Sequence, residues 1–330
     1  MESLLGNEGV RARLWRAADE GRMHHCYLFE GPEGVGKAMT AMRLALTVNC
    51  LGDSPPCGTC SSCRQILAGT HPDVVVVVPD PDRATRVITA DQARGVIASL
   101  QLQRHSARRR VVIIDPADAL TEEAANAMLK TFEEPPAGTQ FILVTARAAS
   151  LLPTVRSRSQ RVRFGPVPRV QLEEWLHGRG LDPALAVLSA GSPGYAIRLG
   201  AGEAQERREV VAQLLATVGQ PLHQLFSFTE AAGKKSDGSV ERTTLVVDAL
   251  EELLRDAVFV ASGREDAVLH PDHVGALSVW ATALHPGGIA RMEKAIAAAR
   301  DRLRLNVNGR VVLEALLTGL NLELSQARRG

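Results

Sequence analysis

Short runs of apolar residues in the first half of the chain alternate with stretches in which apolar residues recur at helical spacing. The run at 73–78 is almost entirely β-branched, which is typical of a strand buried on both faces of a parallel sheet. We predict strands over residues 27–29, 73–78, 111–115, 140–145 and 161–164. Helices are predicted at 37–49, at about 89–102, where Thr89 and Gln92 have capping-box spacing, and from Thr121 to just before Pro135. Strands that alternate with helices predict a doubly wound parallel α/β domain over residues 1–165.

After residues 166–168, which read Pro-Val-Pro, only helical spacing continues. The predicted helices lie at 169–178, 182–190, about 193–200, 204–217, 220–231, 242–262, 270–285, 287–301 and from about 308 onward.

The chain of 330 residues is long enough for two or three domains, and its formal net charge of +1 gives no overall attraction to nucleic acid. Any contact with DNA must therefore be local or made by partners. The arginines at 108–110, with Arg104 and His105, favour a solvated loop over a DNA-backbone contact. No apolar run approaches a membrane span and the N-terminus lacks a signal-peptide layout, so we expect a cytoplasmic protein without membrane contact.

Four of the five cysteines fall within fourteen residues, at Cys50, Cys57, Cys60 and Cys63. This C-x₆-C-x₂-C-x₂-C spacing predicts a closed tetrahedral Zn²⁺ site with a structural role that supports folding of the first domain. An iron–sulfur cluster and unligated thiols are the alternatives. The fifth cysteine, Cys26, is predicted to be a small buried apolar residue.

A phosphate-binding loop follows the first strand, at residues 31–38. The pattern G-x-x-x-x-G-K-[ST] uses backbone N–H groups and a lysine to hold phosphates, and a final hydroxyl to hold Mg²⁺. Here Ala38 stands where that hydroxyl belongs. The remaining candidate nucleotide-binding residues are Gly31, Gly34, Val35, Gly36 and Lys37.

Asp115 closes a buried strand downstream of this loop, where an aspartate that orients Mg²⁺ is expected. The next residue, Pro116, has no carboxylate to act as the general base, a loss worth roughly 10²–10⁴ in rate. Asp118 is an alternative base, and Asp115 could instead merely cap the strand.

Two arginines, Arg156 and Arg158, follow the last long strand. Such residues are usually solvated, but an arginine at a subunit edge can stabilise the transition state on a neighbour's γ-phosphate. Their spacing does not choose between these roles.

Taken together, these features resemble the bacterial clamp-loader AAA+ family of DNA polymerase III. The segments that carry the resemblance are the loop at 24–37, the four cysteines, and the stretches at 111–136, 141–160 and 304–317. The resemblance implies a RecA-like AAA+ domain at 1–165 with a zinc module at 50–63, a helical lid at 166–203 and an all-helical collar at 204–330. In this family the collars join five subunits into an open ring that places a sliding clamp on primed DNA.

The resemblance also implies roles for single residues. Family arginine fingers lie in a Ser-Arg-Cys motif, which here reads Ser157-Arg158-Ser159, so Arg158 is expected to act in trans. The ATP-hydrolysing gamma/tau subunits carry a hydroxyl, an acid and a sensor arginine where this chain has Ala38, Pro116 and Gly194.

These departures imply a non-hydrolysing subunit that partners gamma/tau and delta, without the long C-terminal extension of tau. Binding of ATP or ADP without hydrolysis stays open. The alternatives are an ATP-hydrolysing gamma/tau-type motor subunit and a zinc-dependent nucleic-acid-binding module, and the near-zero net charge counts against the second.

Overall fold

The computed structural model describes residues 4–81, 86–101, 107–232, 242–304 and 307–327. The chain divides into two compact units, Met1–Ile197 and Arg198–Gly330. Among the described residues, no helix is both long enough and apolar enough to cross a membrane.

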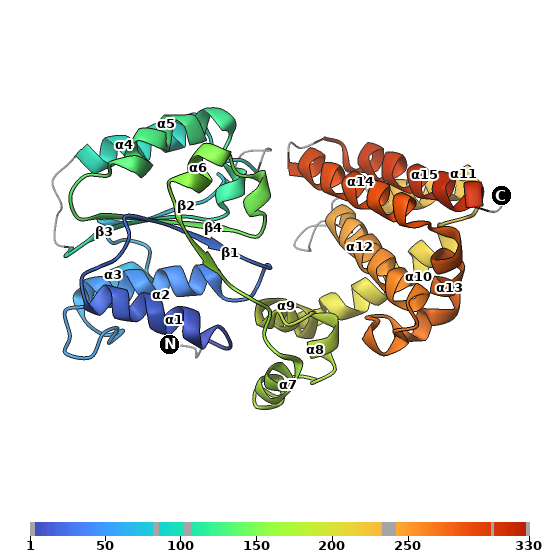
Figure 1. The fold of residues 1–330 in the computed structure, drawn as a ribbon, viewed down its shortest axis with the longest axis horizontal. Helices are drawn as coiled ribbons and strands as arrows, with labels where there is room; N and C mark the ends of the chain where they lie inside the picture. The colour runs from blue at the N-terminus through green and yellow to red at the C-terminus, as the bar shows by residue number, and fades with distance from the viewer. Residues whose placement is uncertain (1–3, 82–85, 102–106, 233–241, 305–306, 328–330) are drawn as a thin grey trace. The chain divides into compact units, whose positions relative to one another are not determined.

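A five-stranded parallel sheet forms the centre of the first unit (Figure 1). Its strands lie in the order β2-β3-β4-β1-β5, so the strand that leads into the glycine loop lies between the fourth and fifth strands. The strands are β1 (Cys26–Glu30), β2 (Val74–Val77), β3 (Arg110–Ile114), β4 (Thr139–Thr145) and β5 (Gln160–Arg163). Each predicted strand is present within about a residue of its expected bounds, and the predicted doubly wound fold class is confirmed.

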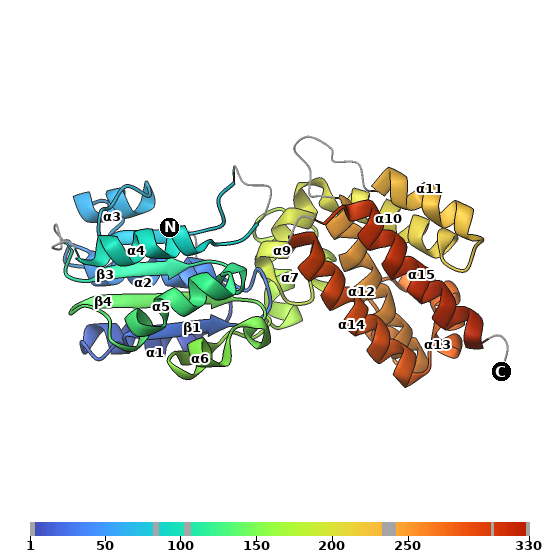
Figure 2. The ribbon, with the colours of Figure 1, turned by 90° about the horizontal axis from the view of Figure 1, so that it is seen from above.

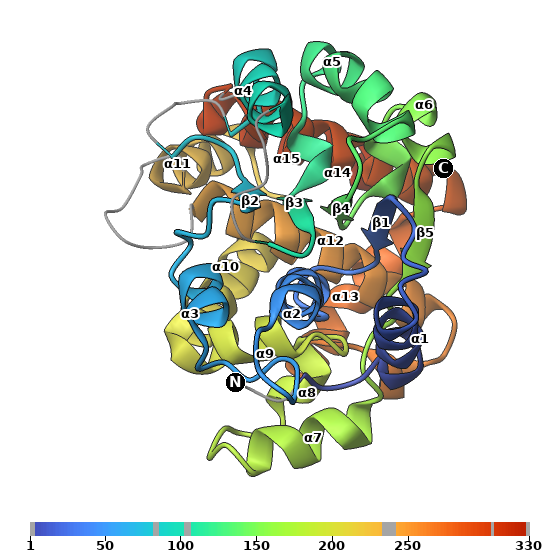
Figure 3. The same cartoon turned by 90° about the vertical axis from the view of Figure 1, so that its left-hand side faces the viewer.

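Helices cover both faces of this sheet, as Figures 1 and 3 show. One face carries α1 (Glu8–Asp19), α2 (Lys37–Asn49) and α3 (Ser61–Leu67), and the other carries α4 (Ala90–Gln101), α5 (Glu122–Glu133) and α6 (Pro153–Ser157). Because side chains alternate along a strand, β1 sends Cys26 and Leu28 into one apolar core and Tyr27 and Phe29 into the other.

The predicted helix starts on the second face are confirmed by their hydrogen bonds. The Thr89 hydroxyl accepts the Gln92 backbone N–H at 3.4 Å, and the Gln92 side chain accepts the Thr89 N–H at 3.0 Å, which completes a capping box. The Thr121 hydroxyl accepts the Ala124 N–H at 3.1 Å at the start of α5.

Three short helices end the first unit: α7 (Arg169–His177), α8 (Leu185–Leu188) and α9 (Pro193–Arg198), of which α9 reaches the unit boundary. The predicted helix at 182–190 is wrong in length, since only the four residues of α8 are helical. Ala190 adopts a φ of +48°, a left-handed conformation that ends the helical path before Gly191.

The second unit is helical, and α14 and α15 lie side by side in it (Figure 2). Its apolar core is centred on α12, which contributes eight of its twenty residues to that core. The helices are α10 (Ala204–Thr217), α11 (Leu222–Ala232), α12 (Arg242–Ala261), α13 (Val274–Ala283), α14 (Pro286–Arg304) and α15 (Gly309–Ala327), and they match the predicted ranges within a few residues.

The basic segment at 108–110 corrects a prediction, because Arg110 is not solvated. Its guanidinium is buried and donates to the Asp73 carboxylate at 3.0 and 3.3 Å and to the Leu100 carbonyl at 3.1 Å. Asp73 is itself fully buried, so this pair joins the starts of β2 and β3. Arg104 and His105, which were grouped with these arginines, lie outside the described residues.

Candidate functional site

The predicted glycine loop connects the carboxyl end of β1 to the amino end of α2. Gly31, Gly34 and Gly36 adopt φ values of +140°, +74° and +91°, conformations that L-residues with side chains rarely adopt. At Gly31 a Cβ atom would also overlap the Phe164 carbonyl. The strand–loop–helix context of a phosphate-binding loop is therefore present.

Lys37, however, is turned back into its own loop. Its ammonium group donates to the carbonyl oxygens of Gly31 at 2.7 Å and Pro32 at 2.6 Å. Burial lowers the pKa of Lys37, and the carboxylate of Asp115 opposes this effect. Two of the three ammonium hydrogens, which a phosphate would need, are thus already taken by the loop.

The segment at residues 192–195, at the start of α9, packs directly on this loop. The Gly194 N–H donates to the Gly34 carbonyl at 3.0 Å, and the Ser192 hydroxyl donates to the Glu33 carbonyl at 2.8 Å. A Cβ atom at Gly194 would lie 3.1 Å from both the Cα and the carbonyl oxygen of Gly34. Glycine at 194 therefore lets the two backbones touch, at the position where the resemblance expects an arginine in hydrolysing subunits.

The groups that would bind Mg²⁺ and activate water beside a nucleotide are largely absent from residues 38, 115 and 116. Ala38 is exposed in the first turn of α2 and offers only a methyl group. Burial raises the pKa of Asp115, and the nearby Lys37 charge opposes the shift. Pro116 has no group that could activate water.

Asp118, the alternative base, is already bound elsewhere. Its carboxylate accepts the Thr145 hydroxyl at 2.7 Å and two guanidinium N–H groups of Arg147 at 3.2 and 3.3 Å. Its side chain is 1% exposed. A carboxylate with these charge-assisted bonds is poorly placed to take a proton from water, so the structure does not support Asp118 as a substitute base.

Arg158 lies between the buried residues Val155 and Ser159 at the end of α6, two residues before β5 begins at Gln160. The Ser159 hydroxyl donates to the Val155 carbonyl at 2.9 Å and lies 3.3 Å from the Cys26 sulfur. The prediction for Cys26 is confirmed, since it is fully buried and burial raises its pKa to about 11. Between these anchors the Arg158 side chain is 32% exposed.

Arg158 and the glycine loop lie at opposite edges of the sheet. Ser159 contacts Cys26 at the amino end of β1, whereas the glycine loop follows Glu30 at its carboxyl end. The two ends, Cys26 and Glu30, are four residue steps apart, which is about 13 Å at 3.3 Å per residue. The structure therefore does not bring Arg158 to the loop of its own chain.

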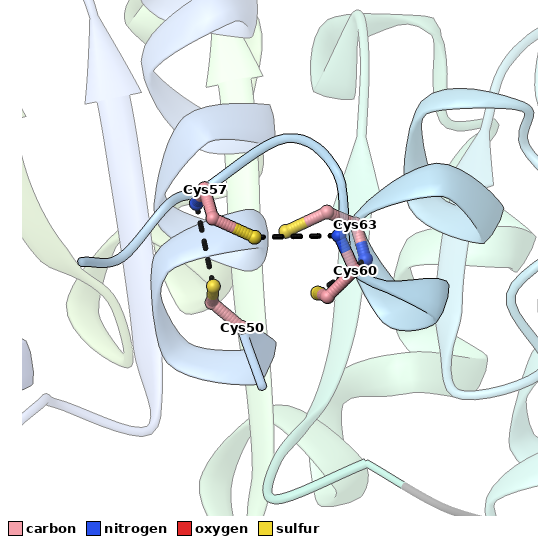
Figure 4. Close-up of side chains that lie close together, drawn as sticks. All are labelled: Cys50, Cys57, Cys60 and Cys63. Atoms are coloured by element: carbon pink, nitrogen blue, oxygen red, sulfur yellow. Dashed lines mark hydrogen bonds between the residues drawn. The ribbon is translucent and has the colours of Figure 1, made fainter. Parts of the chain in front are cut away.

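The four predicted metal ligands converge on one point, as Figure 4 shows. Cys50 follows the last residue of α2, Cys60 caps α3 and Cys63 lies in its first turn. The sulfur atoms all lie within 4.8 Å of one another. The four thiols can therefore hold a metal ion such as zinc.

Backbone N–H groups around the cysteines point at the sulfur atoms. Cys57, Cys60 and Cys63 donate their N–H groups to the sulfurs of Cys50, Cys57 and Cys60 at 3.3, 3.3 and 3.4 Å. Such bonds favour thiolates, and those from Cys60 and Thr59 lower the pKa of Cys57 to about 6. Burial instead raises the pKa of Cys63 to about 12. The case for a metal ion at this site therefore rests on the geometry of the four sulfurs.

Sequence reasoning missed three residues that bind the glycine loop, Arg158 and the arginines of β5. Ser192 binds the loop from 159 residues away, and Glu133 receives the Arg158 Nε–H at 2.9 Å. Glu30, buried at the end of β1, accepts bonds from Arg161 and Arg163. No local spacing signals these pairs, because their members come from different elements.

Comparisons with known proteins show which family this chain is similar to. Residues 6–168 match the family model described as DNA polymerase III, delta subunit. The chain is 33% identical to the DNA polymerase III subunit delta′ of Escherichia coli over 94% of this chain and 92% of that protein, and 29% identical to that of Bacillus subtilis over 93% and 94%. It is also 33% identical to the DNA polymerase III subunit gamma/tau of Mycobacterium tuberculosis, but over only 44% of that protein. The chain therefore belongs to the delta′ family of DNA polymerase III subunits.

Proposed function

We propose that this chain is a non-hydrolysing clamp-loader subunit that supplies Arg158 to the ATP site of a neighbouring gamma/tau subunit. Its partners are then gamma/tau and delta, and through the assembled complex the sliding clamp and primer-template DNA. The observation that carries the proposal is the position of Arg158 at the sheet edge opposite the glycine loop. An arginine at that edge lies a strand's length from its own loop, so it would instead serve a nucleotide held by another subunit.

The state of the chain's own loop supports the absence of hydrolysis. Three separate groups needed for the reaction are replaced, by Ala38, Pro116 and Gly194. Lys37 already donates to two loop carbonyls, and Ser192 and Gly194 bind the loop from outside. Nucleotide binding would have to break the hydrogen bonds that Lys37 makes to the loop. We therefore propose that the loop has a structural role, in which it packs against the start of α9.

The decisive experiment is ATP turnover by the reconstituted loader, with clamp and primed DNA, carrying Arg158→Ala. Turnover at the neighbouring site should fall by roughly 10³–10⁵, the worth of an arginine finger. Arg156→Ala is the matched control, because Arg156 lies two residues away on α6 and has no side-chain hydrogen bond to the described residues. Unchanged turnover with Arg158→Ala would contradict the trans role.

The alternative is an ATP-hydrolysing motor subunit of the gamma/tau type, which the glycine loop alone would support. It predicts steady-state hydrolysis by the isolated chain that Lys37→Ala abolishes. The non-hydrolysing function predicts no such activity to abolish, so this assay separates the two directly.

We further propose that the cysteine cluster holds Zn²⁺ in a structural role. Zinc–sulfur bonds of about 2.3 Å put tetrahedral sulfurs about 3.8 Å apart, which suits sulfurs that all lie within 4.8 Å. Four thiolates leave no open position for catalysis, and the ion would link the end of α2 to α3. Metal analysis of the purified chain should find about one zinc per chain, and Cys60→Ser should lose it.

Residues 166–203 are proposed as the lid and 204–330 as the collar that joins the subunits. The boundary between the compact units, after Ile197, supports a division close to this point.

A further inference from the structure

We propose that Glu133 is a positioning residue for Arg158, which it holds in the orientation needed to reach a neighbour's phosphate. This inference rests on the trans role proposed for Arg158. Glu133 belongs to another helix, α5, and lies 25 residues before Arg158 in the sequence.

Two hydrogen bonds define how the guanidinium is held. Its Nε–H donates to the Glu133 carboxylate at 2.9 Å, and one hydrogen of Nη1 donates to the Thr154 carbonyl at 3.2 Å. Within the described part of the chain, these bonds leave both hydrogens of Nη2 and the second hydrogen of Nη1 without a partner. Nη1 and Nη2 form the fork that binds an oxyanion through two parallel bonds. The side of the guanidinium that binds phosphate is therefore left open.

Glu133 is itself held by a rigid support. It is the last residue of α5 and follows Phe132, which is fully buried and packs edge-to-face on Phe141 of β4 with ring centroids 5.1 Å apart. Arg158 is anchored in turn by the buried residues Val155 and Ser159. Glu133 and Arg158 thus each lie next to buried, packed residues. The hydrogen bond between them fixes the direction of the Arg158 side chain, which would otherwise be free to move.

The expected effect follows from side-chain entropy. A free arginine samples many rotamers and must be ordered when it meets the transition state, whereas Arg158 is already ordered by Glu133. Losing this order should lower kcat at the neighbouring site roughly tenfold, far less than loss of the arginine itself. The KM for ATP should not change, because an arginine finger acts mainly on the transition state.

The test uses the reconstituted loader with clamp and primed DNA, and measures kcat and KM for ATP. Glu133→Ala removes both the charge and the acceptor, whereas Glu133→Gln keeps an acceptor oxygen and should recover much of the loss. Glu134→Ala is the matched control, since Glu134 is the exposed neighbour and its side chain has no hydrogen bond to the described residues. Glu133 is itself 56% exposed at a helix C-terminus, where a carboxylate is unfavourable, so its removal should not unfold the chain.

A double variant separates a role through Arg158 from any other role. With Arg158→Ala already present, Glu133→Ala should cause no further loss of kcat. A full additional loss in that background would overturn the inference, and so would an unchanged kcat for Glu133→Ala alone while Arg158→Ala is impaired. Unchanged turnover for Arg158→Ala would instead contradict the proposed function, so the two failures are distinguishable.

Discussion

The contact between the glycine loop and the segment at residues 192–195, at the start of α9, predicts that Gly34→Ala disrupts the chain far more than Gly36→Ala. Both glycines belong to the same loop and have left-handed φ values, +74° at Gly34 and +91° at Gly36. Only Gly34 faces Ser192 and Tyr195, whereas the nearest atom to a Cβ at Gly36 is the flexible end of Leu4 at 3.4 Å. The pair therefore separates backbone strain, which both variants share, from loss of the contact.

The magnitude can be built from these contacts. An alanine in the left-handed region costs about 1–2 kcal/mol at either position. At Gly34 the added methyl would also overlap the Ser192 hydroxyl and lie 3.0 Å from the Tyr195 nitrogen, so the segment must move away. That movement breaks the bonds from Ser192 to the loop and from Gly194 to Gly34, each worth about 0.5–1.5 kcal/mol. Gly34→Ala should thus lose about 1–3 kcal/mol more than Gly36→Ala.

Amide hydrogen exchange is the suitable assay, because a chain with two compact units need not unfold in one step. Exchange at the Gly194 amide, which donates to the loop, reports opening of this contact directly. Relative to Gly36→Ala, Gly34→Ala should lower its protection by about 5-fold to 150-fold. Equal protection in the two variants would refute the idea that the contact holds the segment on the loop.

Three further changes test other parts of the first unit. Asp73→Ala leaves the Arg110 charge buried without its carboxylate and should lower the free energy of unfolding of the first unit by about 3–5 kcal/mol, measured by hydrogen exchange of the β2 and β3 amides. Glu30→Gln should cost about 1–2 kcal/mol at neutral pH, given that its arginine partners are half-exposed or more. Although burial alone would raise the pKa of Glu30, bonds from those arginines leave it lowered. In pH-dependent unfolding this difference should therefore start to shrink as the pH falls below about 4.3, and it should vanish only below the lowered pKa of Glu30. Removal of metal by a chelator should lower the thermal midpoint of the wild type but not of Cys60→Ser.

The parts of this protein that sequence reasoning predicted well are those determined by neighbouring residues. β-Branched runs gave the strands, and the hydroxyls of Thr89 and Thr121 marked helix starts, because a cap acts within three residues of itself. The cysteine cluster belongs to the same class, since its four ligands lie within fourteen residues. In each case the atoms that interact are close in sequence before they are close in space.

The errors arise where a charged side chain finds a partner that is distant in sequence. The segment at 108–110 reads as a surface cluster, but Arg110 pairs with Asp73, which enters from the neighbouring strand 37 residues earlier. Asp118, considered only as an alternative base, is likewise bound by Arg147, which follows the next strand. Local composition cannot reveal these pairs, because only the strand order of the sheet brings their members together.

Under the proposed function, the length of β1 explains how the chain's own loop can lose its role in hydrolysis while Arg158 keeps its role in trans. Lys37 and Arg158 are separated by the length of β1, and they are supported by different elements, so changes at one should not alter the other. In the reconstituted loader, Lys37→Ala should leave ATP turnover at the wild-type level, although it frees two loop carbonyls. The double variant with Arg158→Ala should match Arg158→Ala alone. A fall in turnover with Lys37→Ala would mean that the chain's own loop contributes to hydrolysis. The hydrogen bonds from Lys37 to the carbonyls of its own loop argue against this outcome.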